Sequence, residues 1–499
     1  MLATARSFTL DGISARQVRV EVDVHRGLPA FSIVGLPDTA VREARERVRA
    51  ALVNCGFEFP LRRIVANLAP ASLRKAGPAL DLAIAAALLA ASGQLRWEAL
   101  ATTALAGELA LDGSVRPVQG ALAMAEEAGR EAGLAGIVVP EANGPEAALA
   151  DGVEVVAIDS LARLRPLAAG EWEAPRPRAL PLALSANGSG PDLADLRGQE
   201  HLRLALEVAA AGGHSLLMVG PPGAGKSLAA RRLPSIMPPL SRGEALEVAR
   251  IASACGRLDG GVPGGRPFRA PHHTISAPGL VGGGNPPRAG EVTLAHRGVL
   301  FLDELCEFRR DSLEALRAPL ETGSVSIARS GAWRELPCRF MLVGAANPCP
   351  CGRGEEDPDC ECGHLQVRRY QGRLSGALAD RIDIVARLGQ PVAAAIAGDP
   401  GESSAAVRER VVAARERQEE RLGSGRCNAE MTPAEARACP VEAAALAELA
   451  AVYERERLSG RAHDRVLRLA RTLADLAGRR RVGPEQMSLA IGLRRREAE

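Results

Sequence analysis

A glycine-rich octapeptide, residues 220–227, has the residue types and spacing needed to bind a nucleoside triphosphate. It follows the pattern G-x-x-x-x-G-K-S, in which backbone N–H groups and a helix N-terminus face phosphate oxygens. Only two of the 62 basic residues are lysines, Lys75 and Lys226, so a generic positive charge in this chain would be an arginine. A compact ammonium fits between phosphates where a guanidinium is too large. The predicted nucleotide-binding loop is Gly220, Pro221, Pro222, Gly223, Ala224, Gly225, Lys226 and Ser227.

An acidic pair further along the chain supplies the groups that hydrolysis needs. Four apolar residues, 299–302, precede Asp303 and Glu304, and such a run is typical of a buried parallel strand. Asp303 is predicted to bind Mg²⁺ together with the hydroxyl of Ser227. Glu304 is predicted to polarise the attacking water. The predicted reaction is therefore Mg²⁺-dependent hydrolysis of a nucleoside triphosphate.

Three further polar residues are candidates for the catalytic site. Asn347 ends another apolar run, 340–346, and is predicted to orient the lytic water. Arg381, within Asp-Arg-Ile-Asp, is either a structural ion-pair residue or a group that stabilises phosphate charge. Arg461, ahead of Arg465, lies near the start of a C-terminal helix and is predicted to approach the phosphates; a solvated helix face is the alternative.

Four of the ten cysteines fall within one short loop, as C-x-C-x₈-C-x-C: Cys349, Cys351, Cys360 and Cys362. Four thiols so close together are hard to explain as core packing. Structural Zn²⁺ sites usually have at least two residues between paired cysteines, and C-x-C is tighter. A structural Zn²⁺ site, a metal-free loop and redox pairing all stay open.

These residues need an α/β scaffold to position them. Residues 1–165 show βα patterns, with predicted strands at 18–24 and 64–68 and predicted helices at 38–55 and 81–91. Residues 166–191 are rich in Pro, Ala and Ser and indicate a linker. Residues 192–395 alternate strands and helices around the nucleotide loop, which predicts a mostly parallel sheet. Residues 396–499 are predicted to form a helical lid domain.

The overall composition and charge of the chain limit the classes of protein to which it can belong. The net charge of +2 gives no overall electrostatic attraction to nucleic acid. The most apolar stretch, 79–91, is too short for a bilayer and contains Asp81, and no charged-then-apolar leader begins the chain. We expect a cytoplasmic protein with no membrane partner.

The chain resembles the AAA+ ATPases in the order of its motifs, which are the loop, the Asp-Glu pair, the strand-end Asn, Asp-Arg-Ile-Asp and the lid Arg. Gly-Gln-Glu at 198–200, Ala-Asn-Pro-Cys-Pro-Cys-Gly at 346–352 and Arg-Tyr-Gln-Gly-Arg-Leu-Ser-Gly at 369–376 narrow the resemblance to the magnesium-chelatase-like subgroup, the YifB/ComM family. The resemblance covers essentially the whole chain. It implies ATP as the nucleotide, a homo-hexameric ring, and Arg381 acting in trans on a neighbouring subunit. Members of the ComM type are associated with DNA branch migration in recombination and natural transformation.

That subgroup also carries a β-hairpin before the strand-end Asn. The matching segment, 324–334, alternates on both sides of Ser-Gly-Ala, which predicts a hairpin. Projecting into the pore of a ring, such a hairpin would hold a polymer, with Arg329 or Arg334 on its phosphates. Ordinary solvated arginines are the alternative.

The N-terminal domain resembles the Lon-type protease domain but lacks its catalytic groups. The position of the nucleophilic serine is Ala79, and the second motif region, 107–122, contains no lysine. Ser–Lys peptidase chemistry is therefore nearly excluded. We interpret the domain as a binding or oligomerisation platform, in which Lys75 either contacts a phosphate or nucleic acid or is incidental.

Two functions remain in competition. The first is a ring-forming ATPase that translocates on branched DNA, consistent with the hairpin and the Arg-rich segment 451–499. The second is a chelatase-type or protein-remodelling ATPase that acts on a protein client, with the N-terminal domain as its receptor. Stimulation of ATP hydrolysis by DNA distinguishes the two.

Overall fold

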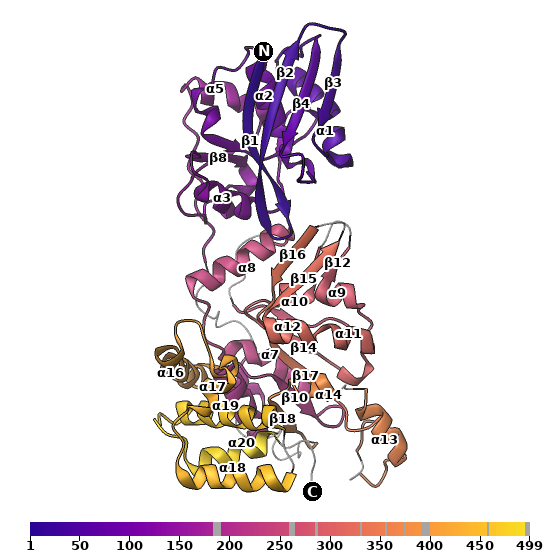
Figure 1. The fold of residues 1–499 in the computed structure, drawn as a ribbon, viewed down its shortest axis with the longest axis vertical. Coiled ribbons are helices and arrows are strands. Elements are labelled where there is room, and N and C mark those ends of the chain that lie inside the picture. The colour runs from indigo at the N-terminus through magenta and orange to yellow at the C-terminus, as the bar shows by residue number, and fades with distance from the viewer. Residues whose placement is uncertain are drawn as a thin grey trace. The chain divides into compact units, whose positions relative to one another are not determined.

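The computed structural model divides into two compact units (Figure 1). The first comprises Met1–Leu182 and Arg242–Pro263; the second comprises Ala183–Ser241 and Gly264–Glu499. The structure describes residues 1–182, 191–258, 265–284, 288–329, 332–354, 357–373, 376–390, 400–456 and 459–494. The side chains of residues 328, 329, 332–334, 376 and 377 are outside this description.

A seven-stranded mixed sheet, ordered β3-β4-β2-β1-β5-β8-β9, forms the centre of the first unit. In β2 every second residue from Val18 to Val24 is buried, as one-sided burial of a strand demands. The strands are β1 (Leu2–Asp11), β2 (Ser14–His25), β3 (Ala30–Val34), β4 (Arg63–Ala69), β5 (Thr103–Leu105), β8 (Gly136–Pro140) and β9 (Glu154–Ile158), with a small hairpin of β6 (Glu108–Leu109) and β7 (Val115–Arg116). The predicted strands at 18–24 and 64–68 are confirmed.

The helices of this unit also match the sequence patterns. α2 is buried at every residue from Asp81 to Leu89, which explains its uniformly apolar composition. Asp38 caps α1 by accepting a hydrogen bond from the N–H of Val41. The helices are α1 (Thr39–Asn54), α2 (Asp81–Ala91), α3 (Ala121–Arg130), α4 (Gly144–Ala147), α5 (Leu164–Ala168) and α8 (Arg242–Ala254).

A buried ion pair joins α1 to α2. The guanidinium of Arg47 donates to both carboxylate oxygens of Asp81, at 2.6 and 3.1 Å, and the N–H of Leu109 donates to the same carboxylate. Burial raises the pKa of Asp81 to about 6, although Arg47 acts to lower it. The ionised carboxylate therefore depends on Arg47 for compensation.

We predict that Arg47→Ala lowers the free energy of unfolding by about 3–5 kcal/mol, because it leaves an uncompensated buried carboxylate. The measurement is urea unfolding of the full chain, followed by the fluorescence of Trp97 and Trp172 of the first unit. Arg45→Ala is the matched control, since that α1 side chain is half exposed; its effect should stay within about 0.5 kcal/mol. Equal effects of the two variants would show that the pair contributes nothing.

Helix α8 packs in the first unit, although its residues lie within the range 192–395 that was expected to form the ATPase core. Ala249 forms an apolar cluster with Leu122 and Leu149. Arg250 pairs with Glu126 of α3 at 3.4 Å, and the carbonyl oxygen of Ser253 accepts a hydrogen bond from the N–H of Gly120. The apolar side of α8 is therefore covered by its packing against α3.

Five parallel strands form the sheet of the second unit, in the order β11-β14-β17-β10-β18. β14 and β17 are buried throughout, as their apolar runs predict. β17 lies between β14 and β10, with Leu302 beside Gly344 and Val219 beside Ala346. The carboxyl ends of these three strands therefore meet at one edge of the sheet. The strands are β10 (Leu216–Val219), β11 (Phe268–Arg269), β14 (Val299–Leu302), β17 (Met341–Ala346) and β18 (Ile384–Arg387).

Helices and two small β-ladders surround this sheet. The predicted hairpin is present: β15 (Ser324–Arg329) and β16 (Ala332–Pro337) pair antiparallel. A second ladder joins β12 (Gly282–Gly283) to β13 (Arg288–Ala289). The helices are α6 (Glu200–Gly212), α7 (Lys226–Ile236), α9 (Ala277–Val281), α10 (Glu291–Leu294), α11 (Arg310–Ala315), α12 (Arg317–Thr322), α13 (His364–Gln371) and α14 (Gly376–Ala379).

The C-terminal region is helical, as predicted, and is drawn in yellow and gold in Figure 1. α19 packs against α6, α16 and α20. Asp475 of α19 is buried and pairs with Arg421 of α16 at 2.9 Å, which joins the two helices, and with Arg471 of α19 itself at 2.7 Å. The helices are α16 (Ser404–Leu422), α17 (Pro433–Arg437), α18 (Ala443–Glu456), α19 (Gly460–Leu476) and α20 (Pro484–Arg494). Within the described ranges, no helix is long and apolar enough to cross a membrane.

Candidate active site

The nucleotide-binding loop joins β10 to α7, which is the strand-to-helix context that the motif requires. Gly223 and Gly225 have φ angles of 80° and 89°, in the left-handed region that favours glycine. α7 begins at Lys226, so the first N–H groups of that helix face the loop. The sequence thus builds an anion-binding helix N-terminus.

The ammonium of Lys226 lies inside this loop. It donates to the carbonyl oxygens of Gly220 at 2.5 Å and Pro221 at 2.9 Å, and to the side-chain oxygen of Asn347 at 3.0 Å. Burial lowers the pKa of Lys226, and Asp303 opposes that effect. The structure therefore brings the predicted lysine and the predicted strand-end asparagine into direct contact.

The predicted magnesium ligands also lie together. The hydroxyl of Ser227 donates to Asp303 Oδ2 at 2.7 Å. A hydroxyl and a carboxylate are hard oxygen donors of the kind that Mg²⁺ prefers. Ser227 and Asp303 therefore fit the predicted ion, which would draw the phosphates of the substrate to this edge of the sheet.

Glu304 follows Asp303 in a constrained position. Its φ of 52° is left-handed, a conformation that non-glycine residues seldom adopt. Its N–H donates to Asp303 Oδ1 at 3.0 Å, and its carboxylate lies 3.2 Å from Nδ1 of His273. The backbone and the histidine together fix the direction of the predicted base.

His273 is a site residue that the sequence reasoning missed. It follows β11. Its ring is tilted by 34° to the ring of His272, with the centroids 4.1 Å apart, and meets Phe308 edge-on. Two adjacent histidines just after a strand, in a chain with only eight, are the signal that identifies the position.

We predict that His273→Ala lowers kcat for ATP hydrolysis by about two- to fivefold and leaves KM unchanged, because a half-exposed pair contributes up to about 1 kcal/mol to the direction of Glu304. Steady-state kinetics measure both constants. His273→Gln, which keeps a hydrogen-bond donor, should retain most of the activity. His201→Ala, at an exposed histidine on α6, is the control. A changed KM with an unchanged kcat would contradict this role.

The structure ties Arg381 to its own subunit. The guanidinium pairs with Glu321 of α12, and its side chain is 13% exposed. The backbone is also held, because Ser215 Oγ donates to the Arg381 carbonyl at 2.7 Å. The ion-pair alternative is therefore realised in this protomer, and action in trans stays a prediction.

The two lid arginines differ. Arg461 is exposed at the start of α19. Arg465 pairs with the buried Asp383 at 3.2 Å. Burial opposes ionisation of Asp383, but His214 and Arg465 outweigh it and lower its pKa to about 2. Arg465 thus has a structural partner, and Arg461 keeps the freedom that phosphate contact requires.

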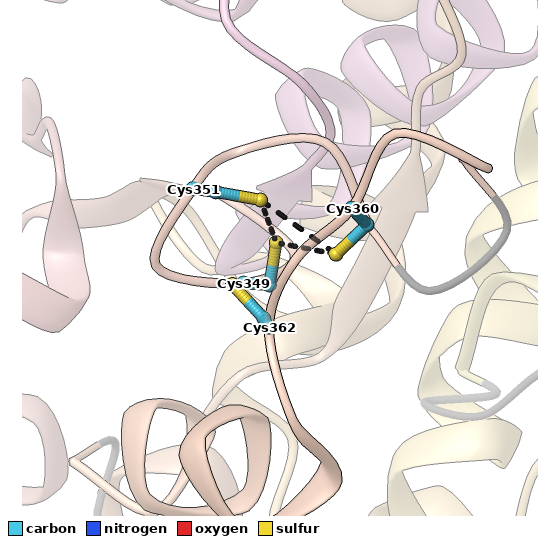
Figure 2. A group of neighbouring side chains, drawn as sticks. All are labelled: Cys349, Cys351, Cys360 and Cys362. Carbon is cyan, nitrogen blue, oxygen red and sulfur yellow. Dashed lines mark hydrogen bonds between the residues drawn. The ribbon is translucent and has the colours of Figure 1, made fainter.

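The four clustered cysteines come together in space (Figure 2). Their sulfur atoms all lie within 4.8 Å of one another, although the spacing is tighter than in usual zinc knuckles. Cys349 is buried, and its sulfur accepts the N–H of Gly354 at 3.2 Å. The Arg353 backbone N–H and the thiol of Cys349 lower the pKa of Cys351 to about 6. All ten cysteines are free thiols, so this cluster is a four-sulfur donor set suited to Zn²⁺.

The remaining candidates lie elsewhere. Arg329 and Arg334 belong to β15 and β16, and their side chains are outside the described part of the structure. Lys75 is buried, with its ammonium on the carbonyl oxygen of Pro70. The fold thus gives Lys75 a backbone partner, and a contact of its ammonium with a phosphate or nucleic acid stays a prediction. Ala79 is buried in an apolar cluster.

A P-loop after β10, an Asp-Glu pair after β14 of the same parallel sheet and a helical C-terminal region define an AAA+ ATPase. Three protein-family models match the sequence: "Magnesium chelatase, subunit ChlI" at residues 192–395, "Subunit ChlI of Mg-chelatase" at 20–143, and "Magnesium chelatase, subunit ChlI C-terminal" at 401–494. The chain belongs to this magnesium-chelatase ChlI-like family, alongside the YifB and ComM proteins.

Three relatives are similar to this chain over nearly their full lengths. An uncharacterised protein of Mycobacterium tuberculosis, Rv2897c, is 44% identical over 99% of this chain and 98% of its own. YifB of Escherichia coli is 43% identical over 93% of this chain and 91% of its own length. Competence protein ComM of Haemophilus influenzae is 40% identical over 99% of this chain and 97% of its own length. A shorter match, 32% identical over 19% of this chain, is to a probable DNA helicase MCM9 of Arabidopsis thaliana, of which it covers 14%.

Proposed function

We propose that this protein is a ring-forming ATPase that couples Mg²⁺-dependent hydrolysis of ATP to translocation on branched DNA. The observation that supports ATP hydrolysis is the convergence of four predicted site residues at one edge of the sheet. Lys226 contacts Asn347 at 3.0 Å, and Ser227 contacts Asp303 at 2.7 Å. The names of two relatives, a competence protein and a probable DNA helicase, support DNA as the polymer. We place this activity in the cytoplasm, because ATP is supplied there.

Each residue has a role in the proposed hydrolysis. The loop N–H groups and Lys226 bind the phosphates, and Ser227 and Asp303 would hold Mg²⁺, which neutralises phosphate charge when bound. Glu304 takes the proton of the attacking water, and Asn347 orients that water. Arg461 contacts the phosphates from the lid of the same subunit.

The proposed assembly is a homo-hexamer, since AAA+ ATPases are typically oligomeric. Arg381 would then reach the nucleotide of a neighbouring subunit and leave Glu321. The hairpin β15–β16 would line the pore, with Arg329 and Arg334 on DNA phosphates. α12 carries Glu321 and ends just before β15, so the partner of Arg381 and the hairpin share one short segment.

The second candidate is a chelatase-type or remodelling ATPase with a protein client. The names of the matching family models favour it, as does a Lon-like N-terminal domain without catalytic groups. In that case the N-terminal domain is the receptor for the client.

We also propose that Cys349, Cys351, Cys360 and Cys362 hold a structural Zn²⁺. The four-sulfur donor set supports this ion over Mg²⁺ or Ca²⁺, which prefer oxygen. Metal analysis of the purified protein should give one Zn²⁺ per chain, and Cys360→Ser should lose it. A metal-free chain that binds no added Zn²⁺ would overturn this assignment.

The deciding experiment is steady-state ATPase activity with no polymer, single-stranded DNA, duplex DNA and a four-way junction. Lys226→Ala and Glu304→Gln are the controls for the site. Stimulation that is greatest with the junction, weakens steeply with salt and is lost in both variants supports the DNA motor. Activity indifferent to every DNA favours the protein client, and no activity at all overturns the ATPase.

A further inference from the structure

One buried carboxylate, that of Asp383, joins the core sheet to the helix α19 of the lid. Asp383 lies two residues after Arg381 and directly before β18. Its Oδ1 pairs with Arg465 of α19 at 3.2 Å. Its Oδ2 accepts the N–H of Ser215, directly before β10, at 3.3 Å and lies 3.4 Å from Nδ1 of His214. The same side chain therefore contacts both the sheet and the lid.

The imidazole of His214 forms a second connection to α19. It is fully buried, and its Nε2 lies 2.8 Å from Oγ1 of Thr472. Gly212, the last residue of α6, leaves room for this contact, because a Cβ there would lie 2.2 Å from the imidazole and 2.6 Å from the Thr472 hydroxyl. Two side chains of α19, about two turns apart, are thus attached to the start of β18 through Asp383 and His214.

The main chain of Arg381 is held by the same group of residues. The hydroxyl of Ser215 donates to the carbonyl oxygen of Arg381 at 2.7 Å and accepts the N–H of Asp383 at 3.0 Å. Between these two residues, the carbonyl oxygen of Ile382 accepts a hydrogen bond from Arg494 of α20. The segment 381–383 is therefore fixed by the sheet on one side and by the C-terminal helices on the other.

We infer that Asp383 is a positioning residue through which helix α19 sets the place of the Arg381 that each subunit offers to its neighbour. This inference rests on the proposed ATPase ring and on the proposed action of Arg381 in trans. α19 also carries Arg461, the proposed phosphate contact, about one turn before Arg465. A shift of α19 on nucleotide binding would move the start of β18, and with it Arg381. The link would thus make hydrolysis in one subunit depend on the nucleotide in the next.

The first test is steady-state hydrolysis by Asp383→Asn and Arg465→Gln proteins. The asparagine keeps the size of the side chain and an oxygen for the N–H of Ser215, but it has no second oxygen for Arg465. We expect each variant to lower kcat about ten- to a hundredfold with KM within about twofold, because a displaced catalytic group costs rate rather than substrate binding. The double variant should cost no more than the larger single effect. Arg465→Gln carries the test alone if Asp383→Asn does not fold.

Mixing with Lys226→Ala subunits gives a readout that a merely structural defect would not move. Asp383→Asn subunits keep their own nucleotide site, and a Lys226→Ala neighbour supplies an Arg381 that is held correctly. The activity of the mixture should therefore rise above that of either protein alone. Arg381→Ala subunits, mixed in the same way, give the reference for this rescue.

Asp464→Asn is the matched control. Asp464 is also a buried carboxylate of α19, but its arginine partner, Arg437 at 2.8 Å, belongs to α17 of the same C-terminal region. Its kcat should stay within about twofold of the wild type, since this pair does not involve the segment that carries Arg381.

The possible failures can be told apart. An Asp383→Asn protein with wild-type kcat, or with a raised KM, overturns the inference. So does an Asp383→Asn protein that Lys226→Ala subunits do not rescue although they rescue Arg381→Ala. If neither is rescued, the proposed action of Arg381 in trans is overturned as well. A wild-type protein that hydrolyses no ATP overturns the proposed function itself.

Discussion

Glu304→Gln is expected to bind ATP with wild-type affinity and to hydrolyse it about 10²- to 10⁴-fold more slowly. The amide keeps the size of the side chain and its contact with His273 but cannot accept the proton of the attacking water. The ligands proposed for Mg²⁺, Ser227 and Asp303, are untouched, so binding should persist. Single-turnover hydrolysis and binding of a fluorescent ATP analogue measure the two properties separately.

Glu307→Gln is the matched control for this prediction. Glu307 is three residues further on, is partly exposed and pairs with Arg373 at 2.9 Å. It should retain activity within about twofold, since an exposed pair contributes little. A Glu304→Gln protein that turns over at the rate of this control would assign the base to another residue, and Asn347 and His273 would be the groups to examine.

Elements with strong local signals could be predicted from the sequence. The helix predicted at 81–91 is α2, whose eleven residues carry no periodicity because almost all of them are buried. The apolar run before Asp303 is β14, and the alternation around residues 330–332 is the hairpin β15–β16. In each case the burial pattern of one element is sufficient to identify it.

Residues whose partners are distant in sequence could not be predicted in the same way. The spacing of Arg381 and Arg465 is compatible with phosphate contact, but the fold gives them Glu321 and Asp383 as partners. α8 has an ordinary amphipathic pattern, and only the fold shows that its apolar side packs on α3 of the first unit. His273 is a site residue because β11 lies next to β14, a neighbour relation that no local pattern encodes.

Arg381→Ala is expected to lower kcat by about 10³-fold or more while leaving ATP binding intact, if its guanidinium stabilises the transition state in a neighbouring subunit. Glu321→Gln is the control for the ion pair seen within the protomer. It removes the charge that holds Arg381 but keeps the arginine, so its kcat should stay within about fivefold of the wild type. If both variants lose activity equally, Arg381 serves the fold of its own subunit.

Mixing two inactive proteins decides between action in cis and in trans. Lys226→Ala subunits retain Arg381 but do not bind ATP productively, and Arg381→Ala subunits bind ATP but lack the guanidinium. In a mixed ring, a Lys226→Ala subunit beside an Arg381→Ala subunit completes one site, so activity should rise above that of either protein alone. Mixed rings that form, as shown by co-purification of two tags, yet stay inactive would place Arg381 in cis. The pair with Glu321 would then be the working arrangement of the side chain, and the nucleotide site would be complete within one subunit.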